Sequence, residues 1–431
     1  MKFGLEPFRD HPIACIATAT TRPSGKRQEA AIALPWHRLS PDELALLEAT
    51  FWSGGAARHA LADSLQFSRS KTNAIAAGLI EEGLLDEAGV QHSTGGRRPE
   101  TLCVHRRIGV LVGIDIGATS LDIALLRPDL GIIARHAQEA DVQAGPGPIM
   151  ARLRTLLPAM LAQNGIAPDR VLAVGIGVPG PVNFAAGQLV NPPLMPGWDS
   201  YAIREDLREV TDAPIFVDND VNLMALGVLW RQRKQIENFL VIKVGTGIGC
   251  GIVCHGELYR GSNGSAGDIG HICADPEGPL CRCGNRGCVE AMAAAPAIVA
   301  MGLEAAQAGR SPALADRLVT KGQLEAADIG AASRAGDAEA DAIVRRSGRL
   351  IGQVLAALVN FYNPSHIFIG GGVSAIGPMF LAAIRQSVNQ RSLALSTRHL
   401  EITSAPLGPE TGLIGAGVLA MREALRSGGP A

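Results

Sequence analysis

Three cysteines lie within eight residues of one another, in the sequence CRCGNRGC, and a histidine precedes them by ten positions. Cys281, Cys283 and Cys288 on one tight glycine-containing turn, with His271 as the fourth ligand, form one of the closed tetrahedral sets of structural zinc. Cys273 is an alternative fourth ligand. A redox dithiol more often has the spacing C-x-x-C, and a disulfide would leave one thiol over. Because four protein ligands leave no position for water, we predict a structural zinc site.

The sequence VDND offers a carboxylate that could act as a base. Asp220 follows an apolar segment that predicts a strand. A carboxylate at a strand end can take a proton from a sugar hydroxyl as its oxygen attacks a phosphoryl group. Asn219 and Asn222 can hydrogen-bond a polyol or hold the loop. The alternative is that Asp220 only caps the helix predicted to follow it, and the residue taken alone favours that alternative.

Glycine-rich turns between predicted strands form a third group of candidates. In GIDIGATS the turn brings backbone N–H groups, the Thr119 hydroxyl and the Asp115 carboxylate together. Such groups suit nucleotide phosphates and a magnesium ion. One glycine turn is weak support, since most only reverse the chain. The turns GTGIG and GGGVS repeat the pattern, so together they favour phosphate binding, with ATP and Mg²⁺ as candidate cofactors.

A winged helix–turn–helix is predicted near the N-terminus. SPDELALLEAT begins with an N-cap Ser40, a proline and acids, which predict a helix. Two further segments with helical apolar spacing are broken at QFS and followed by a Gly-rich hairpin candidate. The alternative is a three-helix module for dimerisation or protein interaction. Acids and bases nearly balance in this region, so its charge does not decide between the two. The candidate DNA contacts on the helix that follows QFS are Arg69, Ser70, Lys71, Thr72 and Asn73. Those on the wing are Arg97 and Arg98.

The composition is that of a globular protein with sizeable cores. The chain has 431 residues, of which 47% are hydrophobic and 19% charged. Its formal net charge of −2 excludes a globally basic nucleic-acid binder, so DNA binding requires a local patch. We find no apolar run as long as a membrane span, and acids and prolines interrupt the first residues where a signal peptide needs an apolar stretch. A cytoplasmic protein is therefore expected, with its cysteines as thiols or metal ligands.

Two segments about 130 residues apart share a pattern of strand, phosphate-type turn and strand: GIDIGATSLDIALL and VGTGIGCGIVCHG. Two copies of one such unit predict an α/β protein with two lobes and a ligand between them. Helices are expected around residues 150–165, from about 296 to 360, and over the C-terminal GLIGAGVLAMREAL.

CRCGNRGCVE, with GDIGH upstream of it, resembles the signature of the ROK family of repressors, open reading frames and sugar kinases. Five further motifs follow the order of that family: GIDIGAT, GVPGPV, DNDVN, GTGIGCGI and IFIGGGVS. The resemblance implies a two-lobed, actin-like ATPase core of the ribonuclease-H type, typically dimeric, with zinc beside the sugar pocket. The N-terminal winged helix with a GGRRP wing resembles the repressor-type members, such as xylose and N-acetylglucosamine repressors.

The resemblance also implies roles for single residues. Asp220 matches the catalytic base and Asn219 the sugar-binding asparagine, whereas Asp268, His271 and Glu290 match the other sugar neighbours, with His271 also a zinc ligand. The matches to the phosphate loops are Asp115, Gly117, Thr119, Thr246 and Gly247, and those to the adenosine-side turn are Gly371 and Gly372.

The chain departs from the kinase pattern mainly on the nucleotide side. Active kinases usually read D-I-G-G-T-K, where this chain has Ala118 and Ser120 in place of glycine and lysine. A methyl group near phosphate and a missing cation both weaken ATP binding. Asp268 is one methylene shorter than the usual glutamate, and Val228 replaces another glutamate. The sugar-binding residues match the kinase pattern better than the nucleotide-binding residues do, as expected of a sugar sensor.

These observations predict a sugar-responsive transcriptional regulator that binds operator DNA as a homodimer or homotetramer and a sugar or sugar derivative in its core. The alternative is an ATP-dependent kinase of hexoses or N-acetylated amino sugars, alone or combined with regulation. The expected domains are a mostly disordered arm (1–39), the winged helix–turn–helix (40–107), a small lobe (108–227 with 412–431) and a large lobe with the zinc motif (228–411).

Overall fold

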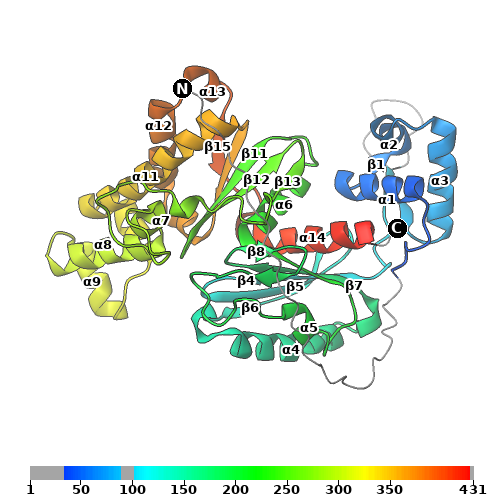
Figure 1. Cartoon of the computed structure of the whole chain (residues 1–431), viewed down its shortest axis with the longest axis horizontal. Coiled ribbons are helices and arrows are strands. Elements are labelled where there is room, and N and C mark those ends of the chain that lie inside the picture. Colours follow the sequence, from blue (N-terminus) through cyan, green and yellow to red (C-terminus); the bar gives the residue numbers. More distant parts are fainter. Residues whose placement is uncertain (1–33, 89–100, 428–431) are drawn as a thin grey trace, which may run out of the picture. The chain divides into compact units, whose positions relative to one another are not determined.

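Two five-stranded sheets form the frame of the chain in the computed structural model, which describes residues 34–88 and 101–427 (Figure 1). The first sheet has the order β10-β7-β4-β5-β6 and the second the order β13-β12-β11-β14-β15. The strands of the first sheet are β4 (Val110–Ile116), β5 (Ser120–Leu126), β6 (Ile132–Glu139), β7 (Val171–Val178) and β10 (Ile215–Asn219). Those of the second are β11 (Phe239–Val244), β12 (Ile248–Cys254), β13 (Glu257–Tyr259), β14 (His366–Gly370) and β15 (Glu401–Ser404).

Both sheets are built on the same plan. In each, three consecutive strands pair antiparallel, and the first of them pairs on its other side with a parallel strand that pairs with one more. The predicted strand–turn–strand units are therefore observed as β4–β5 and β11–β12, in equivalent places of the two sheets. This is the two-lobed α/β architecture that the sequence predicts.

Two helices, α6 (Asp220–Arg231) and α14 (Thr411–Ser427), connect the two sheets through their packing. α14 packs on β4 and β7 of the first sheet, α6 packs on β12 of the second, and the two helices pack on each other (Figure 1). Their backbones approach closely because the contact positions are glycines. A Cβ on Gly415 would lie 1.7 Å from the Leu223 carbonyl oxygen, and one on Gly227 would lie 2.4 Å from that of Thr411.

Of the other helices, α4 packs on β5 of the first sheet and α12 on β15 of the second, whereas α8, α9 and α10 pack on one another. α4 begins at a proline and matches the helix predicted around 150–165, and the Ala-rich region forms α8 to α11. A two-stranded pair, β8 (Val182–Asn183) with β9 (Gln188–Leu189), follows the first sheet's β7. The bounds are α4 (Pro146–Gln163), α5 (Ile203–Leu207), α7 (Val289–Ala293), α8 (Ala295–Gln307), α9 (Pro312–Lys321), α10 (Ala326–Arg334), α11 (Ala338–Tyr362), α12 (Pro378–Arg391) and α13 (Ala394–Thr397).

The N-terminal region forms three helices and a three-stranded sheet of order β1-β3-β2. As predicted, Ser40 caps the first helix, and its side chain and that of Glu43 form a reciprocal capping box. The second and third helices are joined by the short turn at Gln66–Ser68, as expected of a helix–turn–helix. The elements are α1 (Pro41–Ser53), β1 (Ala56–Ala57), α2 (Arg58–Leu65), α3 (Arg69–Glu81), β2 (Leu85–Ala88) and β3 (Thr101–Val104).

Residues 34–39 are the part of the predicted N-terminal arm that the structure describes. They form an ordered turn in which Trp36 is fully buried, and its indole N–H donates a hydrogen bond of 2.9 Å to the Ala424 carbonyl oxygen of α14. Leu34 and Leu39 are buried beside it. A buried indole with a partner for its N–H fixes this segment, so only residues 1–33 of the predicted arm lie outside the described residues.

One apolar stretch of the described residues, Val289–Gln307, has the length and composition of a membrane-spanning helix. The sequence was expected to contain no run of this length. In the structure it is two helices, α7 and α8, that meet at Ala294 just before a proline. Ala293 and Ile298 are fully buried in the core of the second sheet's lobe. The apolar composition of this stretch is therefore explained by core packing.

Candidate functional site

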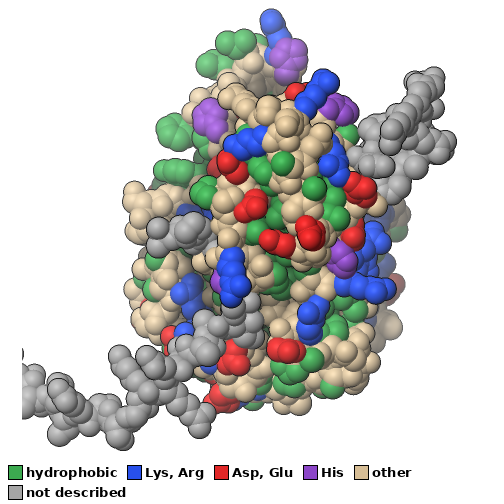
Figure 2. Space-filling view, turned by 90° about the vertical axis from the view of Figure 1, so that its right-hand side faces the viewer, with side chains coloured by type: hydrophobic (Ala, Val, Ile, Leu, Met, Phe, Trp, Pro, Cys, Tyr) green, Lys and Arg blue, Asp and Glu red, His purple; other side chains and the backbone are tan. Residues whose placement is uncertain are grey.

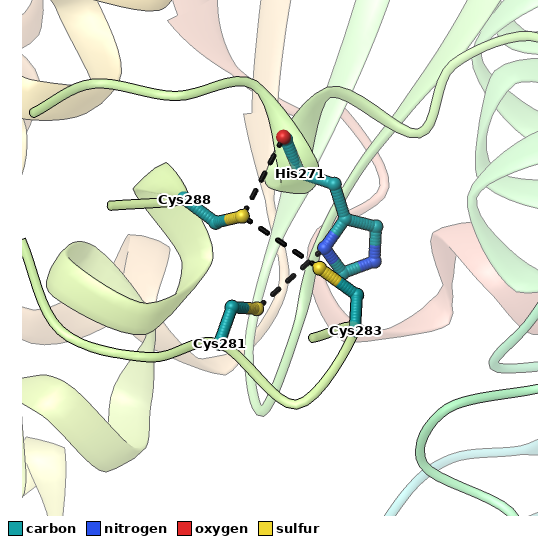
Figure 3. A group of neighbouring side chains, drawn as sticks. All are labelled: His271, Cys281, Cys283 and Cys288. Carbon is teal, nitrogen blue, oxygen red and sulfur yellow. Dashed lines mark hydrogen bonds between the residues drawn. The ribbon is translucent and has the colours of Figure 1, made fainter. Parts of the chain in front are cut away.

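The four predicted zinc ligands lie together at the end of the second sheet (Figure 3). One possible ligand atom from each of His271, Cys281, Cys283 and Cys288 lies within 4.8 Å of all the others. The Cys281 sulfur is 3.7 Å from His271 Nδ1, and the Cys283 and Cys288 sulfurs are 3.7 Å apart. In a tetrahedral site with Zn–S bonds of about 2.3 Å, two sulfurs are separated by roughly 3.8 Å. The side chains present therefore fit a tetrahedral metal ion.

The local backbone explains how three thiols fit on one turn. The Cys281 N–H donates to the Asn285 carbonyl oxygen at 2.7 Å, and Gly284 follows with a φ of 91°. At Gly287, with a φ of 68°, a Cβ would lie 1.6 Å from the Asp275 carbonyl oxygen, so only glycine fits. Cys273, the alternative fourth ligand, is exposed and is not part of the cluster in the described residues.

The cluster joins two segments that carry predicted sugar-binding carboxylates. His271 ends the 3₁₀ turn η3 (Ile269–His271), which directly follows Asp268, and partial burial raises the pKa of Asp268 while His271 lowers it. Cys288 directly precedes α7, whose second residue is Glu290. The Val289 N–H also donates to the Ile272 carbonyl oxygen at 3.0 Å. A metal held by these ligands would thus fix the two carboxylates relative to each other.

Glu290 lies on the second of the predicted phosphate turns. Its Oε2 accepts a 3.0 Å hydrogen bond from the Ile248 N–H, and a Cβ on Gly247 would lie only 2.8 Å from that oxygen. Gly371 packs on the same end of β11, where its Cβ would lie 2.4 Å from the Val244 carbonyl oxygen. The structure therefore brings Glu290, Gly247 and Gly371 together. The Glu290 carboxylate accepts a hydrogen bond from a backbone N–H of the turn that was expected to bind phosphate.

The first phosphate turn remains on the other sheet. Gly117 donates its N–H to the Ser120 carbonyl oxygen at 2.8 Å, which closes the turn between β4 and β5, and Thr119 is exposed. Gly372, on the adenosine-side turn, has open space around it. These residues stay predictions as nucleotide contacts.

Asn219 has a structural role at the end of β10. Its side-chain oxygen accepts from the Val221 N–H at 3.0 Å, and its amide nitrogen donates to the Gly180 carbonyl oxygen at 2.8 Å. The residue that caps α6 is therefore Asn219, whereas Asp220 was the cap in the alternative reading. Asp220 occupies the first helical position instead, where its carboxylate is available to other partners.

A buried ion pair that the sequence reading missed supports this strand end. Asp218, the other aspartate of VDND, accepts hydrogen bonds from Arg260 Nε at 2.8 Å and from Asn222 Nδ2 at 2.8 Å. The Arg260 guanidinium also lies 4.0 Å from the Phe184 ring centroid. Asp218 is 2% exposed, and removal of Arg260 would leave a buried carboxylate without its ion-pair partner. The signal in the sequence was an arginine within the motif YRGSNGSAGDIGH.

A second missed residue contacts the predicted base directly. Lys243 Nζ lies 2.5 Å from Asp220 Oδ2, and Asp220 is largely buried. Lys243 is the lone cation in the apolar strand FLVIKV, a pattern that demands a partner for its charge. Burial opposes its charged form, but Asp220 and Asp115 raise the pKa of Lys243 above its ordinary value.

Asp115 lies close to this pair. A Cβ on Gly177 would lie 3.4 Å from Asp115 Oδ1 and 3.5 Å from the Asp220 Cα. Burial raises the pKa of Asp115 to about 6, against a lowering by Lys243. Asp115 Oδ1 is buried and has no hydrogen-bond partner among the described residues. Asp115, the predicted magnesium ligand, and Asp220, the predicted base, therefore share one cation, which is the ammonium group of Lys243.

The predicted DNA-contacting residues divide into three groups. Arg69, Ser70 and Asn73 are exposed on α3. Lys71 is exposed but pairs with Asp42 at 2.7 Å. Thr72 is a correction, because it is 1% exposed and its hydroxyl donates to the Ser68 carbonyl oxygen within the helix–turn–helix core.

The charges of this region are mixed. Figure 2 looks onto the side that carries the N-terminal helices and shows Lys and Arg side chains interspersed with Asp and Glu. The predicted wing contacts Arg97 and Arg98 fall between β2 and β3, outside the described residues.

Comparison with known proteins gives the chain its family. A model described as the ROK family matches residues 111–423, which is more than half of the sequence. The chain belongs to the ROK family. The match covers both sheets and the cysteine cluster, so the ROK core accounts for the two-lobed, actin-like part of the fold.

The relatives include both kinases and repressors. A glucokinase of Halalkalibacterium halodurans is 33% identical over 314 residues, which cover 72% of this chain and 95% of the relative. A xylose repressor of Bacillus subtilis is 25% identical over 371 residues, covering 86% of this chain and 92% of the relative. A solved ROK family transcriptional regulator, a homolog of the E. coli MLC protein, has a TM-score of 0.73 at 26% identity and covers 90% of this chain and 98% of its own.

The lengths of these matches differ in an informative way. The glucokinase of Halalkalibacterium halodurans is matched almost completely, yet it leaves more than a quarter of this chain unmatched. The two regulators extend over more of this chain. This ROK protein therefore carries residues beyond a kinase-sized core, as the regulators do.

Proposed function

We propose that this ROK protein is a sugar-responsive transcriptional regulator that binds operator DNA as a homodimer in the cytoplasm. The observation that carries the proposal is the helix–turn–helix of α2 and α3, followed by the β2–β3 pair, on the same chain as a ROK core. The regulators that match the chain over most of its length support it. Arg69, Ser70 and Asn73 would read bases and phosphates, and Arg97 and Arg98 would contact DNA from the wing.

The sugar would be bound by side chains of both lobes. Asn219 and Asp220 lie at the end of the first sheet's β10, while Asp268, His271 and Glu290 lie on the segments joined by the cysteine cluster. Carboxylates and amides are suitable partners for sugar hydroxyls, since they supply strong acceptors and donors in fixed directions. A ligand that binds these groups more tightly in one arrangement of the lobes shifts the protein toward that arrangement.

The metal that fits the His–Cys₃ cluster best is zinc. Bound there, zinc would hold η3 and α7 together and would supply no chemistry of its own, because four protein side chains complete its coordination. His271, Cys281, Cys283 and Cys288 would hold it.

A second candidate function is sugar phosphorylation, which the similarity to a glucokinase favours. The ion pair between Lys243 and Asp220 opposes it, because the ammonium group occupies one of the two carboxylate oxygens that would accept the proton. Turnover of ATP with hexoses or amino sugars, abolished by Asp220→Asn, would support the kinase and overturn a sensor-only role.

The regulator is tested by its DNA affinity. Duplexes selected from a random library serve as the probe, and fluorescence anisotropy measures binding with and without sugars. We expect Arg69→Ala and Asn73→Ala each to weaken binding to a selected duplex at least about fivefold, since a base contact contributes about 1–3 kcal/mol. The double variant Arg97→Ala/Arg98→Ala should reduce the salt dependence of binding.

Arg391→Ala serves as the control, because Arg391 is exposed on α12 of the core, away from the helix–turn–helix. It should bind the duplex as the unmodified protein does. If no duplex is selected, or if the α3 variants bind as tightly as the control, the N-terminal region serves another purpose and the regulator proposal fails.

A further inference from the structure

Lys243 joins the two lobes electrostatically at the place where a kinase carries out its chemistry. The lysine belongs to β11 of the second sheet, whereas Asp220 begins α6 and Asp115 belongs to β4 of the first sheet. The Lys243 ammonium group is 2.5 Å from the Asp220 carboxylate. The side chains of Lys243 and Asp220 are only 24% and 9% exposed, so water screens this pair weakly.

Asp115 is near enough to share this charge. Position 177 is a glycine whose missing Cβ would touch both Asp115 Oδ1 and the backbone of Asp220. On the other side, a Cβ on Gly412 would lie 2.4 Å from Asp115 Oδ2. The carboxylate is thus enclosed by backbone, with one buried oxygen that has no hydrogen-bond partner among the described residues. Two carboxylates in such a place need a cation nearby.

In this chain the cation is a side chain, the ammonium group of Lys243. The Asp220 and Asp115 charges keep Lys243 in its ammonium form despite its burial, and Lys243 in turn lowers the pKa of Asp115. Magnesium is usually bound by one or two carboxylates together with waters and substrate phosphates. A divalent cation at this place would have to approach a lysine that already satisfies one of those carboxylates. The residues present therefore do not fit magnesium.

The remaining charges disfavour an anionic ligand as well. Arg260 is paired with Asp218, and the Ile248 N–H of the second phosphate turn is already bonded to the Glu290 carboxylate. Both Lys243 and Arg260 thus have carboxylate partners, and Asp268 adds a further negative charge to the predicted sugar side. A phosphate group bound here would lie near carboxylates. The cations and the backbone N–H that could bind it already have carboxylate partners.

We propose that Lys243 is the resident counter-ion of Asp115 and Asp220 and replaces a divalent cation there, so that the core binds an uncharged sugar without magnesium or nucleotide. The effector class rests on the proposed sugar-sensing function, whereas the counter-ion role rests on the ion pair alone. Asp220 then serves as a hydrogen-bond acceptor for a sugar hydroxyl, with the Lys243 ammonium group as its second partner.

The experiment is a titration of zinc-loaded protein with Mn²⁺, followed by electron paramagnetic resonance of the free ion. In Lys243→Met, two carboxylates lose their cation while the length of the side chain is kept. We expect Mn²⁺ to bind Lys243→Met at least about tenfold more tightly than the unmodified protein, a difference of about 1.4 kcal/mol. The gain should disappear in Lys243→Met/Asp220→Asn, which removes one of the two ligands.

Lys321→Met is the matched control. Lys321 Nζ lies 2.6 Å from the buried Asp328 in another part of the core, and Arg317 remains as a partner of that aspartate. This variant should leave Mn²⁺ binding unchanged. Folded Lys243→Met that binds Mn²⁺ no better than Lys321→Met would overturn the counter-ion proposal.

A measurement on the unmodified protein keeps the proposal testable even if Lys243→Met does not fold. Sugar affinity, measured by calorimetry for glucose, xylose and their phosphates in metal-free buffer, should be unchanged by millimolar Mg²⁺ and by ATP, with the neutral sugars favoured. A sugar phosphate that binds more tightly, or a sugar that needs Mg²⁺, contradicts the effector class. The Mn²⁺ titration needs neither sugar nor DNA, so its failure is distinct from a failure of the regulator proposal.

Discussion

Asp115 carries its charge in surroundings that disfavour it, and this has a consequence for stability. Burial raises its pKa from 3.8 to about 6 in the folded chain. A carboxyl with a raised folded pKa binds its proton more tightly when folded than when unfolded. Ionisation of Asp115 therefore lowers the free energy of unfolding. This loss is complete above the folded pKa of about 6, and it disappears as the pH falls from about 6 toward 4.

Asp115→Asn should therefore stabilise the protein in a pH-dependent way. Urea unfolding at pH 8 should give a free energy of unfolding up to about 3 kcal/mol higher than that of the unmodified protein, since each pKa unit corresponds to about 1.4 kcal/mol. At pH 4 the difference should vanish, because asparagine resembles the protonated acid.

Asp328→Asn provides the control of opposite sign. Burial opposes the charge of Asp328, but the hydrogen bonds from Lys321 and from the Glu325 N–H lower its pKa on balance. Its charge therefore stabilises the fold above pH 4, and Asp328→Asn should weaken it at pH 8. An Asp115→Asn protein that is less stable than the unmodified protein at pH 8 would show that the carboxylate is favourably paired.

At single residues, the sequence predicts chemistry better than it predicts partners. The ligand set of His271 and the three cysteines follows from residue types and short spacing, and the structure brings those four side chains together. Lys243 and Arg260 were missed because each finds its aspartate far along the chain, 23 and 42 residues away. Such pairs depend on which strand ends meet, which spacing does not encode. Thr72 was assigned to the wrong face because only the packing of α3 decides which of its residues are exposed.

Among the elements, η3 and α7 depend on each other through the cysteine cluster. Neither is long enough to be stable alone, since η3 has 3 residues and α7 has 5. Cys283→Ser should remove zinc and weaken sugar binding together, by at least about tenfold, because Asp268 and Glu290 lose their fixed separation. Atomic absorption measures the metal and calorimetry the sugar.

Cys273→Ser separates loss of the metal from loss of any nearby thiol. Cys273 is exposed and pairs by its backbone with Cys288, but it lies outside the cluster. This variant should keep both zinc and sugar affinity. Unchanged sugar binding in a zinc-free Cys283→Ser protein would refute the proposed role of the metal.

Elements with strong local signals are the ones that the sequence predicts well. The Ser40 cap, the β4–β5 and β11–β12 turns and the start of α6 after VDND all follow from a few adjacent residues. The order of the turn at 34–39 could not be predicted in this way. Trp36 is fixed there by a carbonyl of α14, which is 388 residues away in the chain.

Across the whole chain, α14 is in contact with both the candidate ligand site and the N-terminal region. Its second residue, Gly412, lies against the Asp115 carboxylate, and Ala424 near its other end accepts the hydrogen bond of Trp36. In between, it packs on α6, which begins with Asp220. If the proposed sugar shifts α14 on binding, this helix is a direct route to the helix–turn–helix.

Trp36→Phe should uncouple sugar from DNA. The variant removes one hydrogen bond but keeps an aromatic ring, so each affinity measured alone should stay within about twofold. The change in DNA affinity caused by sugar should fall by at least about threefold, since coupling energies between sites are typically about 1–3 kcal/mol. Fluorescence anisotropy with and without the sugar found by calorimetry measures this.

Trp52→Phe is the matched control, because the Trp52 indole N–H donates only within α1, to Glu48 at 3.3 Å. Coupling should survive in this protein. If Trp36→Phe responds to sugar as fully as Trp52→Phe does, the two regions communicate by another route.

The long stretch of sequence between β7 and α14 also bears on how the protein is made. β4 and β7 present an apolar face to α14, yet that helix leaves the ribosome about 240 residues or more after both strands. Completion of the first lobe is therefore a late, long-range event, of the kind that slows folding. Until then the face of β4 and β7 is not covered by α14, and the Trp36 indole N–H lacks the acceptor that it has in the folded chain. The segment that leads into the helix–turn–helix can thus be fixed in place only once α14 has been synthesised.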